Sequence, residues 1–313
     1  MTREAWIAGA LVLCCGVAAI GSWFTHQPTH AAQPAALPNL GGDGAQVAEL
    51  DIQGMITDAD GGFTGSGTSA QAVLKALKQI RDDGAPVLLL NVDSPGGTAA
   101  ASQAIYEEIM RLRHDKHVKV VAAMGDLAAS GAYYISAAAD EIVANPATLT
   151  GSIGVIMHTQ NLQGLMGKLG ITNGAIKSGA HKDIGSPFRP MTPSEQQLLQ
   201  GVVNDTYAQF LDAVSTGRHI PLSTLKPLAD GRIFTGRQAL PLKLVDKLGN
   251  LTDAENEARR LGGLKPDAGI KDYTAGTWKD FVQGLFSQTR ILPLGKALAA
   301  ADLPAKTPLM VYE

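Results

Sequence analysis

One serine of the chain stands where a nucleophile would be expected, shortly after a strand-like apolar segment. Ser130 follows Val118–Met124 and is surrounded by small residues, namely Ala128, Ala129, Gly131 and Ala132. If a helix begins near Ala129, Ser130 lies in its first turn, where free backbone N–H groups and the helix dipole stabilise a developing alkoxide. The small neighbours leave room for a peptide backbone to approach. These neighbours are typical of an exposed nucleophile, but the turn taken alone favours an ordinary N-cap serine with small neighbours.

A second turn contains two consecutive glycines and follows another apolar segment. Residues 93–98 read Asp-Ser-Pro-Gly-Gly-Thr, between Pro86–Val92 and a helical pattern. Pro95 fixes one φ angle, and Gly96 and Gly97 permit positive φ, so successive N–H groups can converge on one point. Such a turn at a helix N-terminus binds an anion or an oxyanion. The common phosphate-binding glycine patterns are absent from the sequence, and a simple tight turn is the alternative.

A candidate general base lies farther along the chain. Lys182 belongs to a polar, turn-rich segment, residues 177–187. A lysine accepts a proton only where burial or positive neighbours lower its pKa by about 2 to 3 pH units from 10.4. Taken alone, the segment favours a solvated surface charge. His158, His181 and His219 remain candidate bases for a Ser-His-Asp triad, although none has a diagnostic setting.

The composition excludes several other kinds of site. The net charge of -3 leaves no basic surplus for binding a nucleic acid. The only two cysteines, Cys14 and Cys15, are adjacent, so they cannot build a four-cysteine or mixed cysteine–histidine metal site. His114 and His117 lack a third ligand at a recognisable spacing. We therefore expect neither a metal nor a cofactor.

The candidate residues lie between alternating strand-like and helical segments. The strand-like segments are Val47–Ile56, Pro86–Val92 and Val118–Met124, and the helical ones are Ser69–Asp82 and Thr98–His114. This β-α-β-α-β order predicts an α/β fold with a largely parallel sheet and right-handed crossovers. Beyond it, Ser152–Met157 resembles a strand, and Pro193–Gly217 a long amphipathic helix introduced by Thr192.

The N-terminal residues predict a membrane anchor. Ala5–Phe24 is an uncharged, mostly apolar stretch of 20 residues, long enough to cross the roughly 30 Å hydrocarbon core of a bilayer. Arg3 precedes it and no Lys or Arg follows until Lys75, so the positive-inside rule places the N-terminus in the cytoplasm and the rest outside. A cleaved signal peptide is the alternative. Residues 25–46 are rich in proline, alanine and glycine, which is typical of a flexible linker.

Together these motifs resemble the signal peptide peptidase A family of membrane-anchored bacterial serine proteases. The matching segments are residues 93–97, 128–135, 150–155, 179–187 and 230–239, in the order of the family. The resemblance implies a crotonase/Clp-protease-like α/β fold and a Ser-Lys dyad. It implies that Ser130 is the nucleophile and Lys182 the general base. It also makes the N–H of Gly97 an oxyanion-hole donor, joined by that of Gly131.

The same resemblance implies an organisation and a setting. Residues 1–24 would be the anchor, 25–46 the linker, 47–265 the Ser-Lys protease domain and 266–313 a C-terminal extension. The family's short members assemble into dome-shaped, octameric rings on the outer, periplasmic face of the inner membrane. The implied substrates are apolar peptides, including cleaved signal peptides. Two departures from the family pattern are Ala132, at a position that is often glycine, and a loosely matching segment after Pro266.

Two other functions share this fold. One is a non-catalytic, membrane-associated scaffold, against which the intact Ser130 and Lys182 argue. The other is a crotonase-type acyl-CoA enzyme, which has similar oxyanion chemistry. The predicted outward topology disfavours it, because acyl-CoA is a cytoplasmic substrate.

Overall fold

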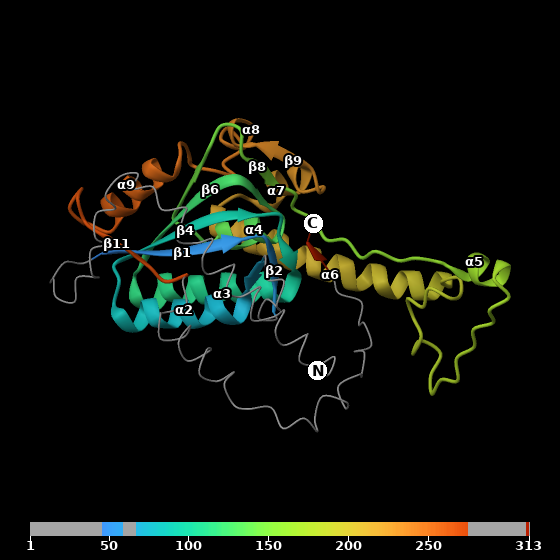
Figure 1. Ribbon diagram of the computed structural model, residues 1–313. Coiled ribbons are helices and arrows are strands. Elements are labelled where there is room, and N and C mark those ends of the chain that lie inside the picture. Colours follow the sequence, from blue (N-terminus) through green and yellow to red (C-terminus); the bar gives the residue numbers. More distant parts are fainter. Residues whose placement is uncertain (1–45, 59–66, 275–310, 313) are drawn as a thin grey trace, which may run out of the picture. The chain divides into compact units, whose positions relative to one another are not determined.

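The computed structural model describes residues 46–58, 67–274 and 311–312 (Figure 1). The chain divides into two units, Met1–Asp43 and Gly44–Glu313, and every described residue belongs to the second. The predicted anchor, Ala5–Phe24, and all but the last residue of the predicted linker lie outside the described residues. Within the described ranges, no helix is both long enough and apolar enough to cross a bilayer.

The centre of the molecule is a largely parallel sheet, as the alternating segments predict. Its main strands pair in the order β10-β7-β6-β4-β1-β11, and each of these pairs is parallel. The strands are β1 (Val47–Gln53), β4 (Val87–Ser94), β6 (Lys119–Ala129), β7 (Glu141–Ala144), β10 (Lys247–Leu248) and β11 (Ile270–Asp272). Two short strands extend one end: β8 (Leu149–Gly151) runs parallel to β6, and β9 (Ile233–Thr235) is antiparallel to β8.

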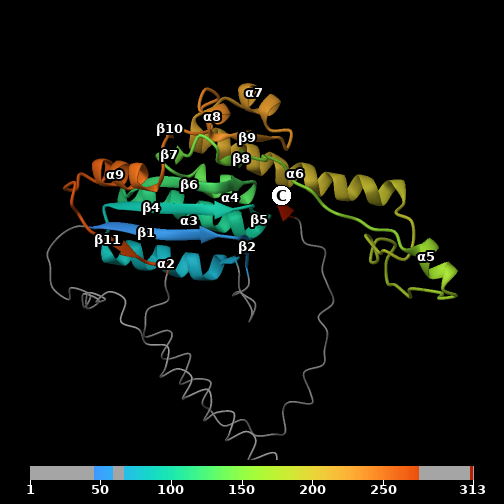
Figure 2. The same ribbon diagram turned by 45° about the horizontal axis from the view of Figure 1, so that its top comes forward.

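Helices cover both faces of this sheet, so its central strands are buried on both sides. α2 (Ala70–Asp83) and α3 (Ala99–Lys116) cover one face, and α9 (Leu251–Leu261) covers the other (Figure 2). Leu88 and Leu90 of β4 pack in the core below α2 and α3, while Val87 and Leu89 face α9. This double burial explains why β4 is a continuous apolar run rather than an alternating one.

A second, smaller sheet lies beside the first, and its strand β2 takes up the end of a strand that the sequence predicts as continuous. Gly54 has a φ of 61°, which divides the predicted Val47–Ile56 strand into β1 and β2. The order of the small sheet is β12-β5-β2-β3. Its strands are β2 (Met55–Thr57), β3 (Gly67–Ser69), β5 (Gly97–Thr98) and β12 (Val311–Tyr312). Gly97, the second glycine of the Pro-Gly-Gly turn, therefore belongs to β5 of this small sheet and not to the main sheet.

The predicted helices are confirmed, but the predicted strand Ser152–Met157 is wrong. β8 ends at Gly151, and the following residues make only an isolated bridge at Ile156. The chain leaves the sheet at this point. Residues 154–205, which we call the arm, project away from the sheet (Figure 1). Glu195 is the arm's only buried residue. The arm contains α5 (Gln163–Lys168) and the first half of α6 (Pro193–Arg218).

The second half of α6 returns to the core. Phe210 and Val214 are fully buried there, and the Phe210 ring lies 4.8 Å from that of Tyr134, centroid to centroid. Tyr134 belongs to the short buried helix α4 (Gly131–Ser136). The remaining elements, which follow α6 in the chain, are α7 (Leu222–Leu225), the 3₁₀ helix η1 (Lys226–Leu228) and α8 (Gly236–Ala239).

Candidate active site

Ser130 stands at the sharp turn between β6 and α4. Its backbone has φ 55° and ψ -121°, a conformation that few residues other than glycine adopt. Its N–H donates to the carbonyl of Gly151, at 2.9 Å, so the turn is held against the end of β8. Ser130 is thus the N-cap of α4 and precedes the helix, rather than lying in its first turn as predicted. Strained turns of this kind occur at functional sites.

The end of β6, which precedes Ser130, is held by hydrogen bonds to the neighbouring strands β8 and β4. On one side, the hydroxyl of Thr150 donates to the carbonyl of Ala128 at 2.7 Å. On the other, Asp93 accepts the N–H of Leu127 at 3.0 Å. The register between β4 and β6 shifts next to Asp93. These contacts replace the regular ladder where the strand bends, and they fix the position of the serine.

The glycine-rich turn lies directly against Ser130. A Cβ on Gly96 would lie 2.7 Å from the nitrogen of Gly131 and 2.9 Å from the Cβ of Ser130. A Cβ on Gly131 would in turn lie 3.1 Å from the nitrogen of Gly97. Only glycines permit this approach. The structure therefore brings together Gly97, Ser130 and Gly131, three of the four residues predicted for the site.

Ser94, the last residue of β4, holds the glycine turn through hydrogen bonds. The fully buried Ser94 donates its hydroxyl to the carbonyl of Gly54, at 2.6 Å, and accepts the N–H of Gly96, at 3.1 Å. The second contact folds the turn back so that Gly97 follows in β5. The sequence pattern could have suggested this role, because serine hydroxyls commonly bond to the backbone two residues farther along.

Two hydroxyls at this site are buried and have no hydrogen-bond partner within the described part of the chain. They belong to Ser130 and to Ser102 of α3, and both residues are fully buried. The Ser102 oxygen would be 2.4 Å from a Cβ on Gly131. An unpaired buried hydroxyl is unfavourable by about 1 to 3 kcal/mol, so such groups are uncommon without a functional reason. Ser102 is not predicted from the sequence, because it follows a run of alanines without a recognisable motif.

Lys182 is not beside Ser130 within one chain. It is exposed, in the loop between α5 and α6, and this loop lies at the outer end of α6, away from α4 (Figure 2). The three histidines proposed as alternative bases, His158, His181 and His219, are also exposed, whereas Ser130 is fully buried. Among the described residues, a single chain therefore brings together the candidate nucleophile and the candidate oxyanion-hole donors, and Lys182 is not beside them.

The residues around Lys182 form a compact ionic network. Arg189 bonds to both Asp183 and Glu195, and Lys177 bonds to Asp183. Hydrogen bonds from Arg189 and Lys177 hold the pKa of Asp183 well below its usual range. The same arginine, with the N–H of Thr192, lowers the pKa of Glu195 to about 2. Both carboxylates are therefore ionised at neutral pH.

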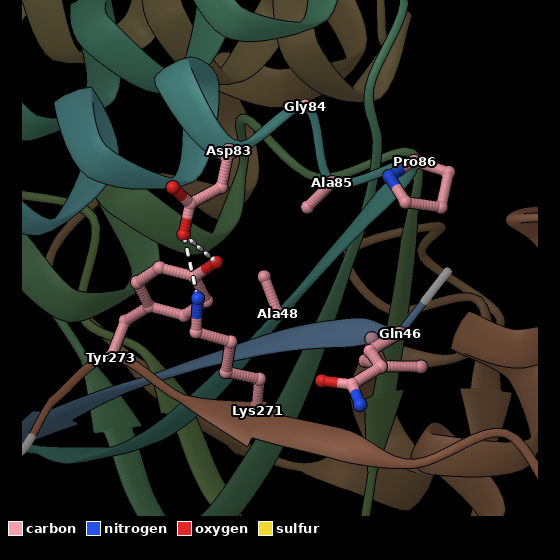
Figure 3. A pocket seen from close by; sticks show the side chains of 9 residues that line it. Gln46, Ala48, Asp83, Gly84, Ala85, Pro86, Lys271 and Tyr273 are labelled. Carbon is pink, nitrogen blue, oxygen red and sulfur yellow. Dashed lines mark hydrogen bonds and ion pairs between the residues drawn. The ribbon is translucent and has the colours of Figure 1, made fainter. Parts of the chain in front are cut away.

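A cavity lies at the opposite end of the parallel strands (Figure 3). It has a volume of about 180 Å³ and is lined by Gln46, Asp83, Lys271 and Tyr273, among others. Asp83 accepts from the Lys271 amine at 2.6 Å and from the Tyr273 hydroxyl at 2.7 Å, and these bonds lower its pKa. The cavity lies at the amino end of β1, whereas Ser130 follows the carboxyl end of β6. Across the described residues, no group of three or more histidine, cysteine or acidic side chains could hold a metal ion.

The chain is similar to members of one peptidase family. The profile of peptidase family S49 matches residues 113–265. "Putative protease slr0021" of Synechocystis is 45% identical over 222 residues, which cover 71% of this chain and 76% of that protein. "Putative signal peptide peptidase SppA" of Enterococcus faecium is 36% identical over 250 residues, covering 79% and 71%. "Serine protease SPPA, chloroplastic" of Arabidopsis thaliana is 34% identical over 229 residues, covering 72% of this chain and 34% of that longer protein.

Proposed function

This chain belongs to the signal peptide peptidase A family, within peptidase family S49, and we propose that it is a membrane-anchored serine endopeptidase with a Ser-Lys dyad. One observation carries the proposal. The hydroxyl of Ser130, which has no hydrogen-bond partner among the described residues, stands in a strained turn beside the backbone nitrogens of Gly97 and Gly131. This arrangement supplies a nucleophile and two donors for an oxyanion. We assign the fold to the crotonase/Clp-protease-like class, which the largely parallel sheet supports.

The proposed reaction uses Lys182 as the proton acceptor. The neutral amine takes the proton of Ser130 as the serine oxygen attacks a peptide carbonyl, and the carbonyl oxygen becomes an oxyanion held by Gly97 and Gly131. The protonated lysine then gives its proton to the leaving amine as the C–N bond breaks. Water attacks the acyl-enzyme by the same proton transfers, which releases the acid and restores Ser130. No metal or cofactor takes part in this scheme.

The base would come from a neighbouring copy of the chain. Several large apolar side chains are exposed on the arm, namely Ile156, Leu165, Leu169, Ile171, Ile176, Phe188, Leu198 and Val202. Side chains of this kind favour burial against another surface, and so many in one projecting segment are typical of a protein interface. We propose that the arm packs on a second copy in a head-to-tail ring, as in the family's octamers. Lys182 of one copy would then face Ser130 of the next.

The proposed substrates are apolar peptides, in particular cleaved signal peptides. The relative from Enterococcus faecium is named a putative signal peptide peptidase, and the one from Arabidopsis thaliana is named a serine protease. The apolar stretch Ala5–Phe24 and the linker at residues 25–46 would hold the catalytic domain near the outer face of the inner membrane, where such peptides are released.

The proposed topology predicts a specific pattern of proteolysis. A protease added to intact spheroplasts is expected to remove the domain after Gln46, because Arg3 holds the N-terminus inside and the linker is accessible. Immunoblotting with an antibody against the catalytic domain measures the loss. Full protection until the inner membrane is lysed would refute the outward orientation.

Covalent labelling tests the proposed chemistry against the two other functions. A fluorophosphonate is expected to label the wild-type protein at Ser130, because the activated serine oxygen attacks the phosphorus atom and displaces fluoride. Mass spectrometry of the labelled peptide identifies the site, and Ser130→Ala is the control. A scaffold or a crotonase-type acyl-CoA enzyme would remain unlabelled, so absence of label in the assembled wild-type protein would refute the proposal.

A further inference from the structure

The carboxylate of Asp183, the residue after Lys182, is bonded to two other cations. The Oδ1 atom of Asp183 accepts from the Lys177 amine at 2.6 Å and from Arg189 Nη2 at 2.8 Å. Its Oδ2 atom accepts from Arg189 Nε at 2.9 Å. Asp183 therefore forms a bidentate pair with the guanidinium of Arg189 and a third hydrogen bond with the amine of Lys177. Its oxygens are directed at Lys177 and Arg189, although Lys182 is its neighbour in the chain.

Arg189 joins this carboxylate to the start of α6. Its Nη1 atom donates to Glu195 Oε2 at 2.8 Å, and its Nη2 atom donates to Glu195 Oε1 at 2.5 Å. Glu195 also accepts the N–H of Thr192 and completes the capping box of the helix. The Glu195 side chain is only 3% exposed. Because Glu195 is buried and belongs to the capping box of α6, Arg189 joins the loop of Lys182 to the start of this helix.

This arrangement matters for a lysine that must be neutral to act. A carboxylate beside an amine favours the ammonium form, and positive neighbours favour the neutral form. The charged groups of the loop that carries Lys182, and of the start of α6 to which this loop is bonded, are Lys177, Asp183, Arg189 and Glu195, with His181 next to Lys182 in sequence. With His181 neutral, their formal charges cancel. Without Arg189 the same set carries a charge of -1, and an oxygen of Asp183 becomes free to pair with Lys182.

Building on the proposed dyad, we propose that Arg189 is the positioning residue of the general base. It holds the Asp183 carboxylate away from Lys182 and ties the loop to α6. The amine therefore remains unpaired and available to the serine of the neighbouring copy. The guanidinium suits this task because it keeps its charge at any working pH and offers a planar fork to two carboxylates at once.

The pH profile of kcat/KM for a fluorogenic apolar peptide tests this role in the full-length, assembled protein. The wild-type profile should rise on an alkaline limb as Lys182 loses its proton. In Arg189→Gln the freed Asp183 stabilises the ammonium, so the limb is expected to move up by about one pH unit, a tenfold loss of activity at a pH on the slope. Asp183→Asn alone should move the limb slightly down, since the cations then face no carboxylate at this position.

The double variant separates electrostatics from a structural defect. In Arg189→Gln/Asp183→Asn the limb should return to the wild-type position, because the competing carboxylate is gone. Arg111→Gln is a matched control: Arg111 also bonds to two carboxylates, Glu107 and Glu108, but on α3. It should leave the limb in place. Circular dichroism and size-exclusion chromatography check that each variant is folded and assembled.

Two results would overturn the proposal. One is an activity loss in Arg189→Gln with the limb unmoved; the other is a shifted limb that Asp183→Asn does not restore. Failure of the underlying dyad has a different signature. In that case Lys182→Ala would itself keep activity, or the wild-type limb would lie in the histidine range, whatever Arg189→Gln does.

Discussion

Ser130→Ala and Lys182→Ala are each expected to reduce kcat/KM for peptide hydrolysis at least about a thousandfold. Either change removes the nucleophile or the base of the proposed dyad, and neither group is effective without the other. The fold should be unaffected in both variants. The Ser130 hydroxyl makes no hydrogen bond with any described residue, and Lys182 is exposed. Peptide hydrolysis, circular dichroism and ring assembly are measured side by side. Lys182→Arg should be as inactive as the alanine variant, since a guanidinium stays protonated.

The histidines provide the decisive controls for this prediction. His158 and His181 lie on the same arm as Lys182 and are as exposed, so in an assembled ring either could approach the neighbour's serine. His158→Ala and His181→Ala are expected to keep most of the activity. Loss of activity in either one as complete as in Ser130→Ala, with an unchanged dichroism spectrum, would replace the dyad with a triad.

The sheet could be predicted from the sequence because its strands are buried on both faces. Val87–Ser94 reads as an unbroken apolar run since helices cover it on each side, and Ser69 and Thr192 mark the starts of α2 and α6 by capping. Ser130 and Gly97 could be singled out because each lies in a turn of small residues after an apolar strand, β6 or β4, and the family resemblance joined them and added Gly131. Local patterns thus predicted most of the fold, whereas the site residues were assigned through the family resemblance.

The arm could not be predicted from local patterns. Ser152–Met157 alternates like a strand, yet within the described residues it makes only an isolated bridge at Ile156, which is exposed. An apolar segment that is to be covered by another molecule looks, in a sequence, the same as one covered by its own chain. For that reason the sequence could name Lys182 but not show that it lies apart from Ser130. The contacts of Arg189 with Asp183 and Glu195 depend on how the loop folds back onto α6, which no spacing rule describes.

Mixing two inactive variants is expected to restore activity if the site is shared between copies. Ser130 is buried in the body of the domain and Lys182 is exposed on the arm, so the two defects would affect different interfaces of a head-to-tail ring. When Ser130→Ala and Lys182→Ala chains are co-expressed equally and mix at random, roughly a quarter of the interfaces should pair an intact serine with an intact lysine. A site built within one chain would yield none.

The measurement is peptide hydrolysis by rings purified through different tags on the two variants, so that each ring contains both chains. Each variant expressed alone is the control and should be inactive. Activity near a quarter of the wild-type value supports a site completed by the neighbour's arm. Continued inactivity in rings that contain both chains would mean that the dyad forms within one chain. The arm would then have to fold back by a movement that brings the loop between α5 and α6 to α4.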